Sequence, residues 1–234
     1  MIYCAASARL TGGAGAVAAP SITTPVFVAA GAGAETTAGP ANVTPAYPGS
    51  LAAGDFFVCV ANGYLDDVTA ATGWTEIYRG AGGNQNFMVF ARDTRASGSE
   101  SGTVNFPIAS SDRTAARIYA FRNCAGTTAT APFEAAATAG VASGAVTNPT
   151  ITPTGAGRLG VLTWGGYTTA TVAPGGTPTG GTWVEPVAEY ISSGPLYLEL
   201  QTADLSAGGA ISGGTTTAGG SNQSFCHGFA LIGV

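Results

Sequence analysis

The chain has no lysine, and charged side chains make up only 9% of its 234 residues, where soluble domains average about 25%. All 8 basic residues are arginines, and the formal net charge is −5. Proteins that bind nucleic acid by neutralising phosphates need a face rich in Lys and Arg. This composition supplies no such face, so we expect no nucleic-acid partner.

Long apolar runs are also missing. A membrane-spanning helix needs about 20 consecutive apolar residues, and glycine, threonine and proline interrupt every apolar run well before that length. We therefore expect no insertion into a membrane. With a single histidine, His227, the chain lacks most members of a Ser-His-Asp triad or a histidine-based zinc site. We expect His227 to be structural, and we expect no catalytic residue, no metal and no cofactor.

The start of the chain has no pattern of a secretory signal. Its first charge is Arg9, and glycines follow directly, whereas a signal peptide begins with a basic segment and a continuous apolar stretch. We expect synthesis in the cytoplasm. The four cysteines form no C-x-x-C pair, and we expect them to be reduced thiols: Cys4, Cys59, Cys124 and Cys226.

The chain is rich in residues that form turns. It has 36 glycines and 13 prolines, which disfavour helix interiors by about 1 and 3 kcal/mol each. Between them lie short runs rich in β-branched and aromatic residues, the pattern of strands separated by turns. The strongest run, Ala53–Asn62, is continuously apolar and suits a strand buried on both faces. We predict an all-β fold, a jelly-roll-like antiparallel β-sandwich.

The second half of the chain repeats the order of motifs in the first half. Matched segments lie at offsets of about 103 to 110 residues, which indicates a weak internal duplication. The clearest pairs are Ala53–Ala61 with Ala156–Trp164, and Gly73–Glu76 with Gly181–Glu185. Each half alone would expose one sheet face. We therefore predict one sandwich over residues 23–234, with halves at about 23–124 and 150–234.

Two segments show little periodicity. Residues 1–22 are rich in glycine and alanine, and we predict an extended N-terminal arm. Residues 125–149 are rich in alanine and threonine, and we interpret them as a loop. That loop is either the crossover between the halves of one sandwich, which we favour, or a linker between two domains.

Carboxylates give only weak signals for chemistry. Asp66 and Asp67 are adjacent, but the chain lacks the D-x-D-x-D-G pattern of a calcium loop, so we interpret them as a solvated turn. Glu76 and Glu185 occupy matching places in the two halves. A glycosidase needs two carboxylates on one cleft, whereas repeat-related positions fall on different sheets, so this pairing is not favoured.

Aromatic residues give a stronger signal. Trp74 and Trp183 recur at the same place in both halves, and we predict that they anchor the core. Tyr64 and Tyr167 follow glycines in expected loops, and with Trp164 they are candidates for exposed contacts to a glycan, because aromatic rings stack on sugars.

An ordered series of motifs resembles virion proteins of tailed bacteriophages and related prophages. The motifs are Pro45-Ala-Tyr-Pro48, Ala53-Gly-Asp-Phe-Phe-Val58, Gly73-Trp-Thr-Glu76, Phe90-Ala-Arg-Asp93 and Tyr119-Ala-Phe-Arg122. The second-half segments Gly157–Leu162 and Gly228–Gly233 also fit this series. The resemblance covers about residues 20–234 and transfers no catalytic residue.

The resemblance implies a structural, non-enzymatic virion protein with a β-sandwich fold, displayed on the particle as part of a tail fibre, tail tip, head decoration or head fibre. We expect the N-terminal arm to bind other virion proteins and the chain to form a homo-oligomer. The alternative is a carbohydrate-binding adhesin module for glycans of the host surface.

Overall fold

A computed structural model describes residues 21–37, 41–65, 67–82, 84–109, 113–143, 145–167, 183–188, 190–192, 196–205, 208–211, 215–217 and 223–234. In these ranges the chain forms strands, turns and bridges and no helix. The predicted N-terminal arm, apart from its last two residues, lies outside the described residues. The all-β prediction is confirmed.

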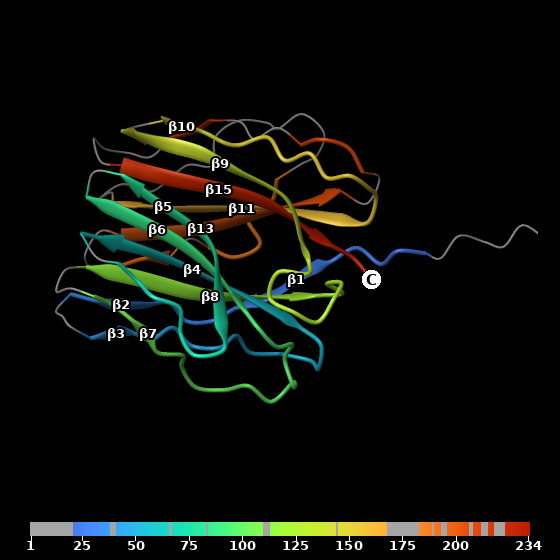
Figure 1. Cartoon of the computed structure of the whole chain (residues 1–234), viewed down its shortest axis with the longest axis horizontal. Coiled ribbons are helices and arrows are strands. Elements are labelled where there is room, and N and C mark those ends of the chain that lie inside the picture. The colour runs from blue at the N-terminus through green and yellow to red at the C-terminus, as the bar shows by residue number, and fades with distance from the viewer. Residues whose placement is uncertain are drawn as a thin grey trace, which may run out of the picture.

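Two antiparallel sheets dominate the structure (Figure 1). The N-terminal sheet has the order β1 (Val26–Ala30), β8 (Thr114–Arg122), β4 (Phe56–Tyr64), β6 (Gln85–Arg92) and β5 (Trp74–Gly82), with β2 (Ala34–Thr36) also paired to β8. The C-terminal sheet has the order β9 (Phe133–Ser143), β15 (Gln223–Ile232), β11 (Arg158–Tyr167), β13 (Leu196–Leu205) and β12 (Tyr190–Ile191).

Two short ribbons complete the fold. β3 (Asn42–Val43) pairs with β7 (Phe106–Pro107), and β10 (Ala145–Thr147) pairs with β14 (Thr215–Thr217). Pro107 has no N–H to donate to a ladder, and it lies in this marginal ribbon rather than in a central strand.

The same strand order recurs in both sheets. Counted along the chain within each half, the main strands lie in the order first, last, second, fourth and third. Each sheet thus comes from one half of the chain, as the internal duplication predicts. The order does not confirm the jelly-roll detail, because no main strand of one half joins the sheet of the other.

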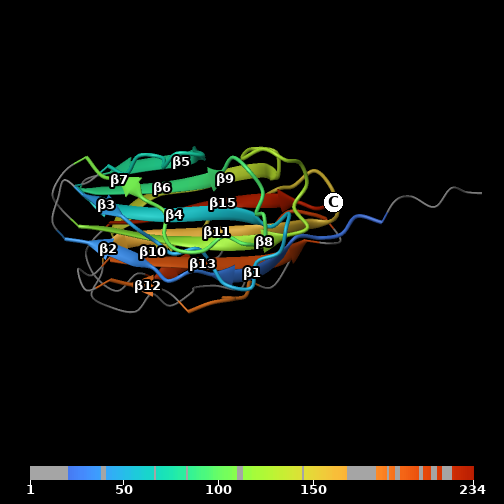
Figure 2. The ribbon, with the colours of Figure 1, turned by 90° about the horizontal axis from the view of Figure 1, so that it is seen from below.

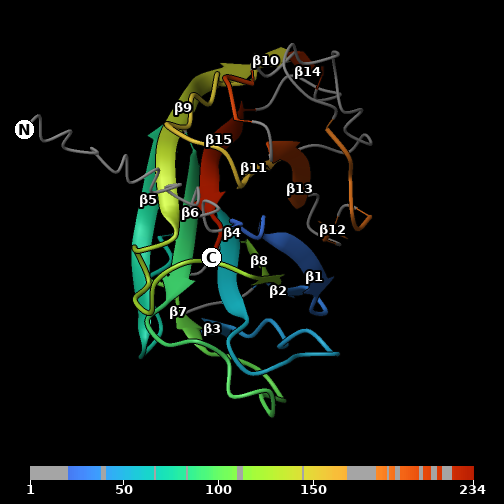
Figure 3. The same ribbon diagram turned by 90° about the vertical axis from the view of Figure 1, so that its right-hand side faces the viewer.

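The sheets pack face to face. Strand β8 lies against β13, β4 against β13 and β11, and β5 and β6 against β15. Consequently the β5 edge of one sheet and the β9 edge of the other lie on the same side of the sandwich (Figure 3). The two halves are therefore related by an approximate two-fold rotation that exchanges β4 with β11.

Three apolar layers result. The layer between the sheets holds residues from both, among them Phe56, Val58, Phe87, Leu198 and Phe229. A second layer covers the outer face of the N-terminal sheet, and a third covers the outer face of the C-terminal sheet. Strand β4 is buried on both faces, which confirms the interpretation of its continuous apolar run.

The interpretation of residues 125–149 as a loop is wrong. This segment contains β9, the edge strand of the C-terminal sheet, and also β10. Strand β9 pairs with β15 with two irregularities in register. Its alanines and threonine show no alternation of apolar and polar residues, so pairing with β15, and not a local pattern, specifies this strand.

Candidate functional site

The structure brings Tyr64 and Tyr167 together. Each ends the central strand of its sheet, β4 or β11, and their ring centroids lie 5.0 Å apart. Arg113 donates a hydrogen bond from Nη1 to the Tyr167 hydroxyl at 3.1 Å. Both rings are partly exposed. We call Tyr64 and Tyr167 the tyrosine pair, a surface feature at one end of the sandwich, built from equivalent positions of the two halves.

The two sheets approach each other closely next to the tyrosine pair. The Asn62 side-chain amide on β4 donates to the Gly166 carbonyl on β11 at 2.8 Å. A Cβ at Gly165 would lie 2.4 Å from the Phe87 ring, so only glycine allows this contact. The aromatic core of one sheet thus reaches the backbone of the other directly beneath the pair.

Trp164 does not fit the surface role expected of it. Its side chain is fully buried, and its indole N–H donates to Asn148 Oδ1 at 3.0 Å. Alternation along β11 directs Trp164 to the outer face of the C-terminal sheet, where Val146, Ile151 and Ile211 cover it. The expectation of an exposed glycan contact is therefore corrected: Trp164 belongs to the third apolar layer.

The other two tryptophans occupy matching places on the two outer faces. Trp74 is 6% exposed and packs edge-on against Phe106 at 5.2 Å. Trp183 is only partly buried against the third layer. It precedes Val184, which bridges to Thr202. Their repeat relationship is thus visible in the fold, but the two indoles differ in burial.

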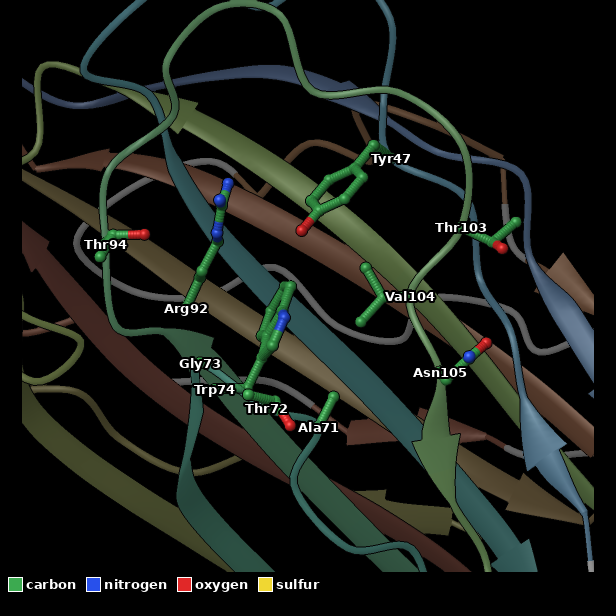
Figure 4. Close-up of a pocket in the computed structure, with 10 residues that line it drawn as sticks. All are labelled: Tyr47, Ala71, Thr72, Gly73, Trp74, Arg92, Thr94, Thr103, Val104 and Asn105. Atoms are coloured by element: carbon green, nitrogen blue, oxygen red, sulfur yellow. The ribbon is translucent and has the colours of Figure 1, made fainter.

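A cavity of about 430 Å³ opens beside Trp74 on the outer face of the N-terminal sheet (Figure 4). In the close-up the Tyr47 ring and the Trp74 indole lie on opposite sides of this space, with Arg92 on one flank and Val104 on the other. Thr103 and Asn105 also line it, together with the turn before Trp74.

This cavity could not be predicted from the sequence. Its residues come from four separate stretches, and three of these stretches overlap motifs of the family resemblance, Pro45–Pro48, Gly73–Glu76 and Phe90–Asp93. No local spacing indicates that Tyr47 and Arg92 meet Trp74.

Two of the carboxylates that the sequence offered for chemistry, Asp67 and Glu76, form ion pairs with an arginine. Arg79 forms ion pairs with both Asp67 and Glu76. Asp66 lies outside the described residues. Glu76 lies on β5, at one edge of the N-terminal sheet, and Glu185 lies near β13 toward the opposite side of the sandwich. These two glutamates therefore do not share a cleft.

The remaining ion pairs clamp strand ends. Arg122 binds buried Asp55 through Nε at 2.7 Å and Nη2 at 2.8 Å. Arg92 binds Glu100 at 2.8 Å, and Glu100 also accepts from two backbone N–H groups. These bonds hold the pKa of Glu100 down at about 2, against the opposing effect of its desolvation by burial.

His227 is buried between the sheets. Its imidazole stacks on the Tyr78 ring with centroids 4.0 Å apart and planes 4° apart. Desolvation lowers the pKa of His227 to about 4, so the ring is neutral near pH 7. A neutral, stacked, buried imidazole links β15 to β5.

Cysteines and acidic groups form no metal centre in the described ranges. Cys59, Cys124 and Cys226 are free and buried, and burial raises the pKa of each thiol. Cys4 lies outside those ranges. No cluster of three or more His, Cys, Asp or Glu is placed there to hold a metal ion. The same ranges contain no helix with the length and apolar character that a membrane crossing requires.

Comparison with known proteins adds no family: no protein-family model, no curated protein and no solved structure matches the chain.

Proposed function

We propose that this chain is a structural, non-enzymatic protein displayed on the surface of a tailed-bacteriophage particle, in a tail fibre, tail tip, head decoration or head fibre. The sequence resemblance indicates the class of particle. The observation that carries the proposal is the two-ended layout of the sandwich, in which chain entry and the tyrosine pair lie at opposite ends.

The entry end is well defined. The Thr23 N–H donates to the Val234 carbonyl at 2.5 Å, so the first and last described segments meet (Figures 1 and 2). Strands β4 and β11 both begin at this end, where Gly157 contacts Ile22. Both strands end at the tyrosine pair. A sandwich attached through residues 1–22 therefore presents the tyrosine pair outward.

The charge arrangement is consistent with a structural role. In the described residues Asp55, Asp67, Glu76, Glu100 and Glu134 all form ion pairs with arginines. Such pairs fix strand ends and loops to the sheets. Arginine fits this use because its planar guanidinium binds carboxylates through two parallel hydrogen bonds.

Deletion of residues 1–20 tests the proposal. We expect the truncated chain to keep its far-ultraviolet circular dichroism and its Tm but to be absent from purified particles. A full-length Tyr64→Phe/Tyr167→Phe variant is the matched control, and we expect it to be incorporated normally. Normal incorporation of the truncated chain would reject attachment through the arm.

Glycan binding by an adhesin module is the second candidate, and the tyrosine pair favours it. Two partly exposed rings, of which Tyr167 is held by a hydrogen bond from Arg113, offer apolar faces and hydroxyls. A glycan array should then show binding that Tyr64→Ala or Tyr167→Ala abolishes and that Tyr190→Ala, on the edge strand β12, leaves intact. Absence of any binding to host-surface glycans leaves the structural role alone.

A further inference from the structure

The cavity beside Trp74 combines aromatic walls with a polar rim. Trp74 and Tyr47 supply the aromatic walls, the exposed threonines Thr72 and Thr94 supply hydroxyls at the rim, and Arg92 supplies N–H groups. Its volume of about 430 Å³ falls in the range of small-molecule sites, about 300–1,000 Å³.

The walls are held in place before any ligand arrives. The Arg92 guanidinium lies 5.5 Å from the Tyr47 ring centroid and 5.4 Å from that of Phe57. Glu100 fixes its far side. The Tyr47 ring also packs against the Phe57 ring, with centroids 5.2 Å apart. Side chains locked in this way lose little entropy when they bind a ligand.

The cavity is close to neutral. Glu100 is ionised at any physiological pH, because backbone N–H groups and Arg92 stabilise its charge, and it balances the charge of Arg92. Burial raises the pKa of Tyr47, so its hydroxyl stays protonated. An anion gains no unpaired cation here, and a cation finds its carboxylate already bound by three donors. Charge therefore favours an uncharged ligand.

We propose that the cavity binds one neutral sugar unit of a surface glycan. A pyranose ring presents an apolar C–H face and a belt of hydroxyls that donate and accept, and the cavity offers an indole, a phenol, hydroxyls and a guanidinium as partners. This inference rests on the glycan-binding candidate but places a site on the outer face of the N-terminal sheet, separate from the tyrosine pair.

The test uses the full-length chain and defined probes. Saturation-transfer NMR and calorimetry are run with methyl α-D-glucopyranoside, methyl β-D-galactopyranoside, methyl α-D-mannopyranoside and N-acetylglucosamine. N-acetylneuraminic acid and glucosamine serve as anionic and cationic comparators. The double variant Thr72→Val/Thr94→Val removes two rim hydroxyls while keeping the aromatic walls. Thr150→Val, at an exposed threonine of the second half, is the matched control.

We expect at least one neutral sugar to bind, and the double variant to raise its Kd by about tenfold, the size expected for one or two lost hydrogen bonds. The Tm of the double variant and the affinity of Thr150→Val should equal those of the unaltered chain. The proposal is overturned if no neutral sugar binds, if only a charged sugar binds, or if the double variant binds as well as the unaltered chain. Binding lost in Tyr64→Ala but kept in the double variant would assign glycan recognition to the tyrosine pair instead.

Discussion

The two halves of the molecule share a strand order but differ in what covers their outer faces. On the outer face of the N-terminal sheet, Trp74 and Phe90 pack against Phe106 of the β3–β7 ribbon. The C-terminal sheet places the polar residues Glu199 and Gln201, hydrogen-bonded to each other at 2.7 Å, in its buried outer side. The shared central layer constrains the strand order in both halves, whereas each outer face has diverged with its own loops.

Repeat-related positions show the same divergence. Asp55 precedes β4 and pairs with Arg122, whereas its counterpart Arg158 begins β11 and pairs with Glu134. Each half thus has an acid–base clamp at the start of its central strand, but the charge at the repeat-related position is opposite and the partners lie on non-equivalent strands, β8 and β9. Comparing matched substitutions in the two halves measures how far the duplicated positions still share a role.

The largest difference is expected at the tryptophans. Trp74→Ala should lower the free energy of unfolding by about 3–5 kcal/mol, the usual cost of removing a buried aromatic side chain. Trp183→Ala should cost about 1–3 kcal/mol, since its indole is only partly buried. Urea denaturation of both variants measures the difference. Equal losses would show that the outer layers contribute alike despite their different burial.

The next effect is the pH dependence from His227. Its pKa is about 4 in the folded chain and about 6.5 when unfolded, so the unfolded state binds a proton first as the pH falls. Its contribution to stability is complete above pH 6.5 and is lost as the pH falls toward 4. At pH 4.5 the free energy of unfolding is therefore about 2–3 kcal/mol lower on account of His227.

His227→Phe should remove this part of the pH dependence, since phenylalanine keeps a flat ring against Tyr78 and Phe229. Urea denaturation at pH 7.0 and pH 4.5 for both proteins isolates the effect from the carboxylates. An equal loss of stability in both proteins between these pH values would contradict the assignment.

A smaller contrast is expected between the two clamps. Asp55 is fully buried and binds Arg122 and the Ala52 N–H, so Asp55→Ala should cost about 2 kcal/mol. Glu134 is partly exposed beside Arg158, and Glu134→Ala should cost about 1 kcal/mol. Thermal unfolding of the two variants shows which substitution lowers the stability more. A reversed ranking would place the stronger clamp in the second half.

The smallest effect on stability is expected at the tyrosine pair. Tyr64→Ala or Tyr167→Ala should cost about 1 kcal/mol, the contribution of a partly exposed aromatic pair, and the two losses should be similar because the residues are equivalent. Thermal melts of the single and double variants test this. A loss comparable to that of Trp74→Ala would make the pair a core element rather than a surface feature.

Much of the fold could be predicted from local pattern. The continuous apolar run of β4 indicated burial on both faces, and the motif order indicated two equivalent halves. Strand β9 could not be predicted, because its alanines, glycine and threonine carry no period, and the ladder to β15 alone defines it. An alternating pattern identifies a strand that has one apolar face and one polar face, and the sequence of β9 does not alternate in this way.

The candidate sites were less predictable. Two tyrosines after glycines could be recognised as strand ends, but their contact depends on how the sheets pack. Trp164 was misjudged because alternation places it on one face of β11 without saying that a loop layer covers that face. The cavity beside Trp74 requires Tyr47, Arg92 and Asn105 from separate stretches of the chain, and such convergence is a property of the folded chain only.

Electron cryomicroscopy of assembled particles would show whether and how the chain is attached. We expect density for this sandwich on the particle surface, with the Thr23–Val234 end against a neighbouring virion protein and the tyrosine pair facing outward. Absence of the chain from purified particles, or a sandwich bound to the particle through its tyrosine-pair end, would contradict this expectation.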